Sequence, residues 1–332
     1  MNKKLIKYMI SLLVLLVFSI LVSLNYGLIS ISPSEVWQTF LGNGTTKQEL
    51  VLFSIRMPSV VLAIIVGAAM AISGAILQAI TKNELADPGI LGINSGAGLA
   101  VVIYISFFQG TASLSSYNVY LLPFFAFVGA LATAVVIIFL SWKNGFQSFR
   151  LVLVGIGVNA GLTALLVALQ LKMDPIDFMQ VVVWLSGDLW ATQWKYVYAI
   201  LPWIILLLPI TFYKVKSLNI LQLGSSISKG LGIEVNKERL ILLLLAVSLA
   251  GIGVSAGGGI AFLGLIAPHI ARRLVGPKHE RLLPIAALVG SCILLIADTI
   301  GRNIILPSEL PAGIVVSIIS APYFIYLLLK SK

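Results

Sequence analysis

The segment that comes nearest to a nucleotide site is Gly224–Gly230, with the sequence GSSISKG. A phosphate loop of the form GxxxxGK(S/T) needs a glycine directly before its lysine and a strand in front of the loop. Ser228 takes the place of that glycine, and the residues before Gly224 show no strand pattern. We therefore expect no ATP site and no phosphate chemistry in this chain.

Candidate metal ligands are few. Cys292 is the single cysteine, and His269 and His279 are the two histidines. A transporter of bare metal ions usually gathers Asp, Glu, His, Cys or Met within its spans, because the water shell of the ion must be replaced. The sequence shows no such cluster. We expect no metal site and no covalent step, and a passenger other than a naked ion.

Asp298 is the one acid that lies clearly inside a long apolar run, and Arg302 follows it by one helical turn. This spacing favours an ion pair. A membrane acid could also carry protons, so a gradient-driven secondary transporter that depends on Asp298 is an alternative. A membrane receptor or scaffold is another, although we expect no soluble sensor domain beside the spans.

The composition explains where these residues must sit. The chain has 332 residues, of which 59% are hydrophobic and only 10% are charged. Soluble proteins carry about 25% charged residues, so most of this chain must face lipid rather than water. The net charge of +10 fits basic cytoplasmic loops better than a nucleic-acid partner.

Apolar runs of about 20 residues, the length that crosses a bilayer, predict an all-α polytopic membrane protein with ten transmembrane helices in a single permease domain, residues 1–332. The runs are 7–29, 58–80, 90–108, 118–141, 150–171, 195–213, 239–256, 259–273, 282–301 and 311–329. With the N-terminus inside, 17 of the 22 basic residues lie on the inner side. A nine-span model would place Lys330 and Lys332 outside, so the positive-inside rule favours ten spans and two cytoplasmic termini.

Two outer segments carry helix signals. In 30–57, Ser32 is a suitable helix cap, and Pro33 and Glu35 follow it in the first turn. In 172–194, too few residues are apolar for a span, and the tryptophans suit the membrane interface, so we expect a short interfacial helix. These tryptophans are Trp184, Trp190 and Trp194.

Two glycine-rich strings echo each other inside predicted spans, GIGVNAG at 155–161 and GIGVSAG at 251–257. Small residues at helical spacing let helices approach closely in lipid. We therefore interpret both strings as packing surfaces. Asn159 is polar in the middle of a span and could line a path.

The segment 214–238 lies between two spans on the predicted cytoplasmic side. Gly224 interrupts it, Ser225 and Ser226 could cap a helix start, and Gly230 or Gly232 could end that helix. Apolar residues form two short faces, one with Leu218, Ile220, Leu221 and Leu223, the other with Ile227, Leu231 and Ile233. The pattern predicts two very short helices that either lie on the bilayer or dock a partner.

Five stretches, in order and over almost the whole chain, carry a family resemblance: 67–98, 223–239, 258–276, 282–302 and 309–330. Their sequences are GAAMAISGAILQAITKNELADPGILGINSGAG, LGSSISKGLGIEVNKER, GGIAFLGLIAPHIARRLVG, LLPIAALVGSCILLIADTIGR and ELPAGIVVSIISAPYFIYLLLK. Together they resemble the iron–siderophore and cobalamin importer permeases (FecCD type) of the ABC transporter superfamily. The resemblance implies a type II importer permease with ten spans in a bacterial cytoplasmic membrane.

The resemblance also implies partners. A second permease subunit, of the same or a related chain, would complete the path. Two ATPase subunits would bind on the cytoplasmic side and use ATP and Mg. An extracytoplasmic binding protein would deliver the chelate. No cofactor is bound by this chain itself. A siderophore is the expected cargo, with cobalamin and haem as alternatives.

Site residues follow from the same resemblance. The loop 214–238 would be the coupling loop, and Arg56 and Arg302 would dock the binding protein, although the family's second arginine is Ser59 here. The ATPase-coupling residues would be Leu218, Leu221, Leu223, Gly224, Ser225, Ser226, Gly230, Leu231 and Gly232. Residues expected along the translocation path are Gly155, Gly157, Asn159, Gly161, Ser317 and Ser320.

Overall fold

The computed structural model describes residues 3–27, 29–108, 118–143, 145, 147–189 and 193–330, and within these ranges it holds helices and no strands. Trp190 and Lys332, which entered the predictions above, lie outside them. The helices are α1 (Lys3–Asn25), α2 (Pro33–Phe40), α3 (Thr46–Glu49), η1 (Leu50–Arg56), α4 (Met57–Thr81), α5 (Ile93–Phe107), α6 (Asn118–Ser141), α7 (Ser148–Gln170), α8 (Pro175–Leu185), α9 (Trp194–Tyr213), α10 (Val215–Gln222), α11 (Ser225–Gly230), α12 (Val235–Gly257), α13 (Leu263–Val275), α14 (His279–Ile304) and α15 (Ala312–Lys330).

The all-helical membrane architecture is confirmed, and each of the ten predicted runs overlaps one helix, with boundaries that differ by a few residues. In the described residues, seven helical segments are long and apolar enough to cross a membrane. The other three runs correspond to α5, α13 and α15, and α13 has only 13 residues. The count of ten spans therefore stays a prediction, while the multi-pass character of the chain is established.

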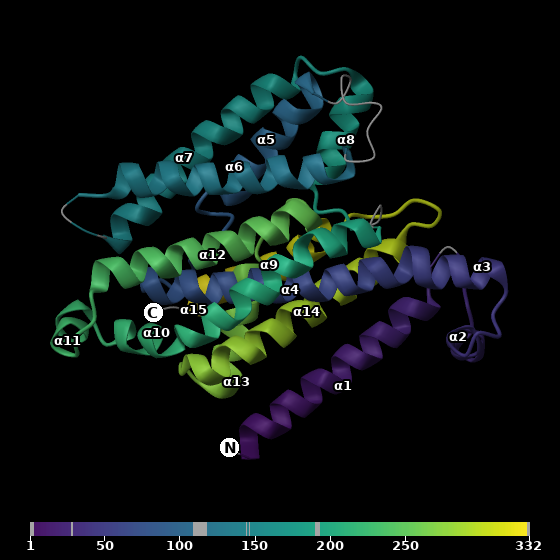
Figure 1. Ribbon diagram of the computed structural model, residues 1–332, viewed down its shortest axis with the longest axis horizontal. Helices are drawn as coiled ribbons and strands as arrows, with labels where there is room; N and C mark the ends of the chain where they lie inside the picture. Colours follow the sequence, from purple (N-terminus) through teal and green to yellow (C-terminus); the bar gives the residue numbers. More distant parts are fainter. Residues whose placement is uncertain are drawn as a thin grey trace.

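Helix α4 forms the centre of the bundle. Figure 1 shows it running through the middle of the molecule, with α12 on one side, α14 on the other and α9 crossing it obliquely in this view. Glycines make this close packing feasible: a Cβ added to Gly74 would lie 1.7 Å from the carbonyl oxygen of Gly264, and one on Gly67 would lie 2.5 Å from that of Gly290. The backbones of α13 and α14 thus lie directly against α4.

The two echoing glycine strings differ in their surroundings. In α12, Gly251 contacts Phe127 and Gly253 contacts Met70, with distances of 3.2 and 3.0 Å from an added Cβ, so the packing interpretation is confirmed there. In α7, an added Cβ on Gly157 or Gly161 would meet no atom within 4 Å. Helix α7 belongs to the outlying layer with α5, α6 and α8 (Figure 1), and much of its surface is open.

The two segments that the sequence predicts on the outer side both contain short helices. Ser32 caps α2 in a capping box: the Ser32 N–H donates to the Glu35 carboxylate at 2.8 Å, and the Glu35 N–H donates to the Ser32 hydroxyl at 3.4 Å. The Ser32 hydrogen bonds lower the pKa of Glu35. The segment 172–194 contains α8, which covers only Pro175–Leu185.

Candidate coupling and docking sites

The segment between α9 and α12 contains the pair of very short helices that the sequence predicts, α10 and α11. Gly224 joins them with a φ of 111°, a conformation that favours glycine. Gly224 is also the residue at the start of α11, and no side chain caps that helix. The interpretation of Ser225 and Ser226 as caps is therefore wrong, because the turn places both serines inside the helix; Ser225 instead accepts a hydrogen bond from Arg239 at 3.3 Å.

Ser228 is a residue of this segment whose role the sequence did not reveal. It is fully buried, and its hydroxyl lies 2.9 Å from the carbonyl oxygen of Ile220 and 2.7 Å from that of Gly224. The side chain thus joins α11 to α10. The only sign of this role in the sequence was that Ser228 is a small polar residue close to the junction of two short helices.

The predicted coupling residues separate into two groups. Leu218 and Leu221 are 0% and 1% exposed, so they anchor α10 in the core and are closed to a partner in this structure. Leu223 and Leu231 are 56% and 59% exposed, and Ile227 is exposed beside them. These three residues form what we call the apolar docking face. The polar and glycine members of the predicted set are exposed or half-buried around it: Gly224, Ser225, Ser226, Gly230 and Gly232.

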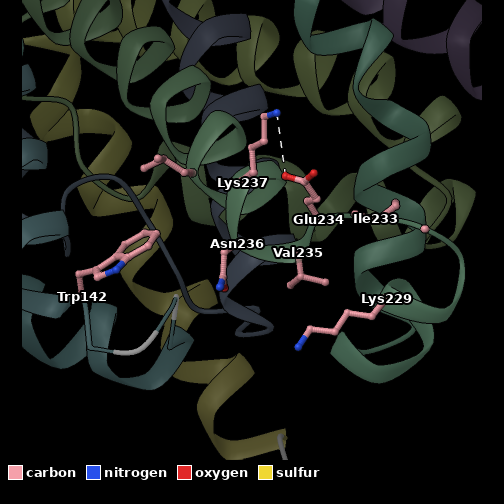
Figure 2. Close-up of a pocket in the computed structure, with 9 residues that line it drawn as sticks. Trp142, Lys229, Ile233, Glu234, Val235, Asn236 and Lys237 are labelled. Carbon is pink, nitrogen blue, oxygen red and sulfur yellow. Dashed lines mark ion pairs between the residues drawn. The ribbon is translucent and has the colours of Figure 1, made fainter.

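A pocket of about 730 Å³ opens beside α11. Figure 2 shows Trp142 on one side of it and Lys229 on the other, with Asn236 between them. Glu234 and Lys237 form an ion pair at 3.9 Å on its wall, and both side chains are mostly exposed. Lys229 and Gly232, which lie on either side of Leu231 in the chain, also line this pocket.

The short helices are held to the bundle by polar contacts as well as by leucines. Lys214 pairs with Glu238 of α12 at 2.7 Å, and both side chains are largely buried. Together with the contact between Arg239 and Ser225, this ion pair ties the start of α10 and the start of α11 to α12.

At the other end of the bundle, Arg56 and Arg302 line one pocket of about 210 Å³, which we call the outer pocket because the sequence predicts that this end faces outward. Both side chains are buried. Arg56 donates to the carbonyl oxygens of Leu24 and Ile29, so it holds the outer end of α1. In this structure the guanidinium groups are engaged within the chain.

The predicted pairing of Asp298 with Arg302 is confirmed. Arg302 also donates to the Ser23 hydroxyl at 2.8 Å. The carboxylate of Asp298 is 4% exposed and lies against a fixed cation, which disfavours its use as a proton carrier.

Glu309 lines the same outer pocket and was not singled out in the sequence. Its Oε2 atom is buried and has no hydrogen-bond partner within the described residues. Burial raises the pKa of Glu309 to about 7, although Arg302 acts in the opposite direction. The outer pocket therefore holds an acid that can change its charge near neutral pH.

The predicted path residues are only partly brought together. Asn159 accepts a hydrogen bond from the Ser95 hydroxyl at 2.6 Å, and that hydroxyl lies 3.1 Å from the Thr163 hydroxyl. These three residues form a polar cluster between α5 and α7. It lies on the face of α7 that also carries Gly155, which packs on Leu91, whereas Gly157 and Gly161 lie on the opposite face with nothing near them. In α15, Ser320 is buried and Ser317 donates to the carbonyl oxygen of Gly313.

Among the described residues, no group of three His, Cys, Asp or Glu side chains is placed to hold a metal ion. The polar cluster on α7 offers hydroxyl and amide groups instead. Such groups can form hydrogen bonds with a passing solute without binding a bare ion.

Comparisons with known proteins agree with this architecture. The iron(3+)-hydroxamate import system permease protein FhuG of Bacillus subtilis is 55% identical over 332 residues, which cover 100% of this chain and 98% of that protein. The iron-uptake system permease protein FeuC of the same organism is 42% identical, with 98% of each chain covered.

A solved structure of a metal-chelate type ABC transporter in an inward-facing conformation has 30% sequence identity and a TM-score of 0.86, covering 98% of this chain and 99% of that one. The profile of the FecCD transport family matches residues 15–330. This chain is a permease that belongs to the FecCD transport family.

Proposed function

We propose that this chain is the permease subunit of an ATP-driven importer that moves a ferric hydroxamate siderophore across a bacterial cytoplasmic membrane. The observation that carries the proposal is the α10–α11 pair, which exposes Leu223, Ile227 and Leu231 next to the pocket of Figure 2. Exposed apolar residues that are held rigidly at the end of a bundle suit a permanent partner. We expect no nucleotide site in this sequence, so this partner would be the ATPase.

The proposed assembly contains two copies of the ATPase inside, a second permease subunit of the same or a related chain, and a binding protein outside. Import proceeds by alternating access between an outward-open and an inward-open state. Binding of ATP and docking of the loaded binding protein shift this equilibrium only through contacts that differ between the two states. This chain supplies the path and both docking surfaces.

The hydroxamate assignment is supported by relatives and by the polar cluster on α7. The most similar relatives reported above are named as iron-hydroxamate and iron-uptake permeases, while a hemin permease of Yersinia pestis is 38% identical. A ferric hydroxamate hides its metal and presents oxygen atoms and apolar arms. Ser95, Asn159 and Thr163 offer donors for such oxygen atoms without ligating iron.

The test is uptake of a panel of radiolabelled chelates in cells with and without this chain. The panel contains hydroxamate, catecholate and citrate complexes of iron, haem and cobalamin, and each is measured with the ATPase active or disabled. We expect hydroxamate uptake that requires both proteins. Uptake that needs this chain but not the ATPase would contradict the importer proposal, and dependence on another chelate would correct the substrate.

A further inference from the structure

Helix α14 begins without a cap of its own. Lys278 stands at its cap position and makes no side-chain capping bond, although the first N–H groups of a helix need acceptors. The acceptor comes from another helix: the Oδ1 atom of Asn219 in α10 accepts the backbone N–H of His279 at 3.0 Å. The same oxygen lies 2.9 Å from the Nδ1 atom of His279.

The other half of the Asn219 amide is also used. Its Nδ2 atom donates to the Glu280 carboxylate at 2.7 Å. A carboxylate can only accept and a backbone N–H can only donate, so these two neighbours fix the orientation of the amide, and the His279 ring must carry its proton on Nδ1 in this bond. One side chain of α10 thus holds the first two residues of α14 through three contacts.

Apolar packing reinforces the same junction. Leu218 and Leu221, on the same short helix as Asn219, are buried, and so is His279. Helix α10 contacts both α4 and α14. Helix α10 therefore lies between the docking face and the start of α14, and it contacts α14 directly.

We propose that Asn219 is a positioning residue that passes movement of the docking face to α14, an inference that rests on the proposed function of α10–α11 as the ATPase-docking element. Helix α14 continues from His279 to Ile304, and Arg302 near its far end lines the outer pocket. The cross-helix cap thus connects the inner docking face to a helix that reaches the outer face.

An exchange of donor and acceptor tests this role. In Asn219→Asp the new carboxylate faces the Glu280 carboxylate, so the contact that measured 2.7 Å becomes a repulsion. In the double variant Asn219→Asp/Glu280→Gln, the amide and the carboxylate have changed places and the net charge equals that of the wild type. Asn219→Ala removes the contacts without adding charge, and Asn43→Asp adds the same charge at an exposed outer position.

The variants are reconstituted with the ATPase, the binding protein and ferric hydroxamate in proteoliposomes. The readouts are ATPase affinity, ATP hydrolysis and chelate imported per ATP hydrolysed, each per folded transporter. We expect Asn219→Asp and Asn219→Ala to lower the import per ATP about fivefold or more. We expect both single Asn219 variants to bind the ATPase with an affinity within about twofold of the wild type. The double variant and Asn43→Asp should import as much chelate per ATP as the wild type, within the same twofold margin.

The proposal is overturned if both single Asn219 variants keep the wild-type import per ATP. It is also overturned if the double variant does not restore the ratio, or if import falls only in proportion to lost ATPase binding, because a purely structural role would give those results. Should Asn219→Asp fail to fold, Asn219→Ala and the double variant decide the question. Wild-type uptake that ignores the ATPase would refute the proposed function itself, so the two failures are distinguishable.

Discussion

Removal of Arg302 should destabilise the fold before it affects any docking. Arg302 and Asp298 are 8% and 4% exposed, and Arg302→Ala would leave the Asp298 carboxylate buried without its cation. Breaking a buried ion pair in this way costs about 3–5 kcal/mol. The Ser23 hydroxyl would lose its donor as well.

The assay is the free energy of unfolding in mixed micelles, measured by steric trapping. Arg302→Ala should lose about 3–5 kcal/mol, whereas Asp298→Leu/Arg302→Met, which replaces both charges by apolar groups, should be neutral or stabilising. Lys47→Ala removes an exposed outer cation and should change stability by no more than about 0.5 kcal/mol. A loss of less than about 1 kcal/mol in Arg302→Ala would refute the reasoning, because the pair would then be weak in the way that exposed pairs are.

This result bears directly on the docking role expected for Arg302. A charge reversal there would place a third acid beside Asp298 and Glu309, so a loss of binding-protein docking could reflect a damaged outer pocket. Docking must therefore be compared only among variants whose unfolding free energy is that of the wild type. The apolar double variant provides this comparison.

Three further outcomes are expected. Gly74→Ala should lower the yield of folded protein in size-exclusion chromatography, because its Cβ would lie 1.7 Å from the Gly264 oxygen, while Gly161→Ala should not, since nothing lies within 4 Å. Leu231→Asp, at an exposed site, should reduce co-purification of the ATPase about tenfold without reducing that yield. Glu309 binds its proton more tightly in the folded protein, so its contribution to stability falls as pH rises from about 4.5 to about 7; Glu309→Gln should flatten the melting temperature over this pH range.

Local features of the structure could be predicted from the sequence, because they depend on neighbouring residues. The capping box of α2 is encoded by Ser32, Pro33 and Glu35, and the break between α10 and α11 is encoded by Gly224, whose φ of 111° suits no other residue as well. The ion pair of Asp298 and Arg302 could be predicted from their four-residue spacing alone, because that spacing corresponds to about one helical turn.

The candidate site was less predictable, because burial depends on which helix lies opposite. Leu218 and Leu223 belong to one predicted apolar face, yet one is buried and the other is 56% exposed. Gly155 and Gly157 belong to one string, yet only Gly155 has a neighbour. The sequence also showed no sign that Arg56 donates to the carbonyl oxygens of Leu24 and Ile29 at the end of α1; its docking role stays a prediction.

The sequence by itself determined that this protein lies in lipid, where its helices form, and that a short helical pair lies between two of them. These features could be predicted because the length of an apolar run and the type of turn residue act locally. Only the tertiary structure decided which residues of that pair are available to a partner. It also brought Asn219 to the uncapped start of α14, 60 residues further along the chain. Such a contact leaves no periodic trace in the sequence, because it depends on how separate helices pack in three dimensions.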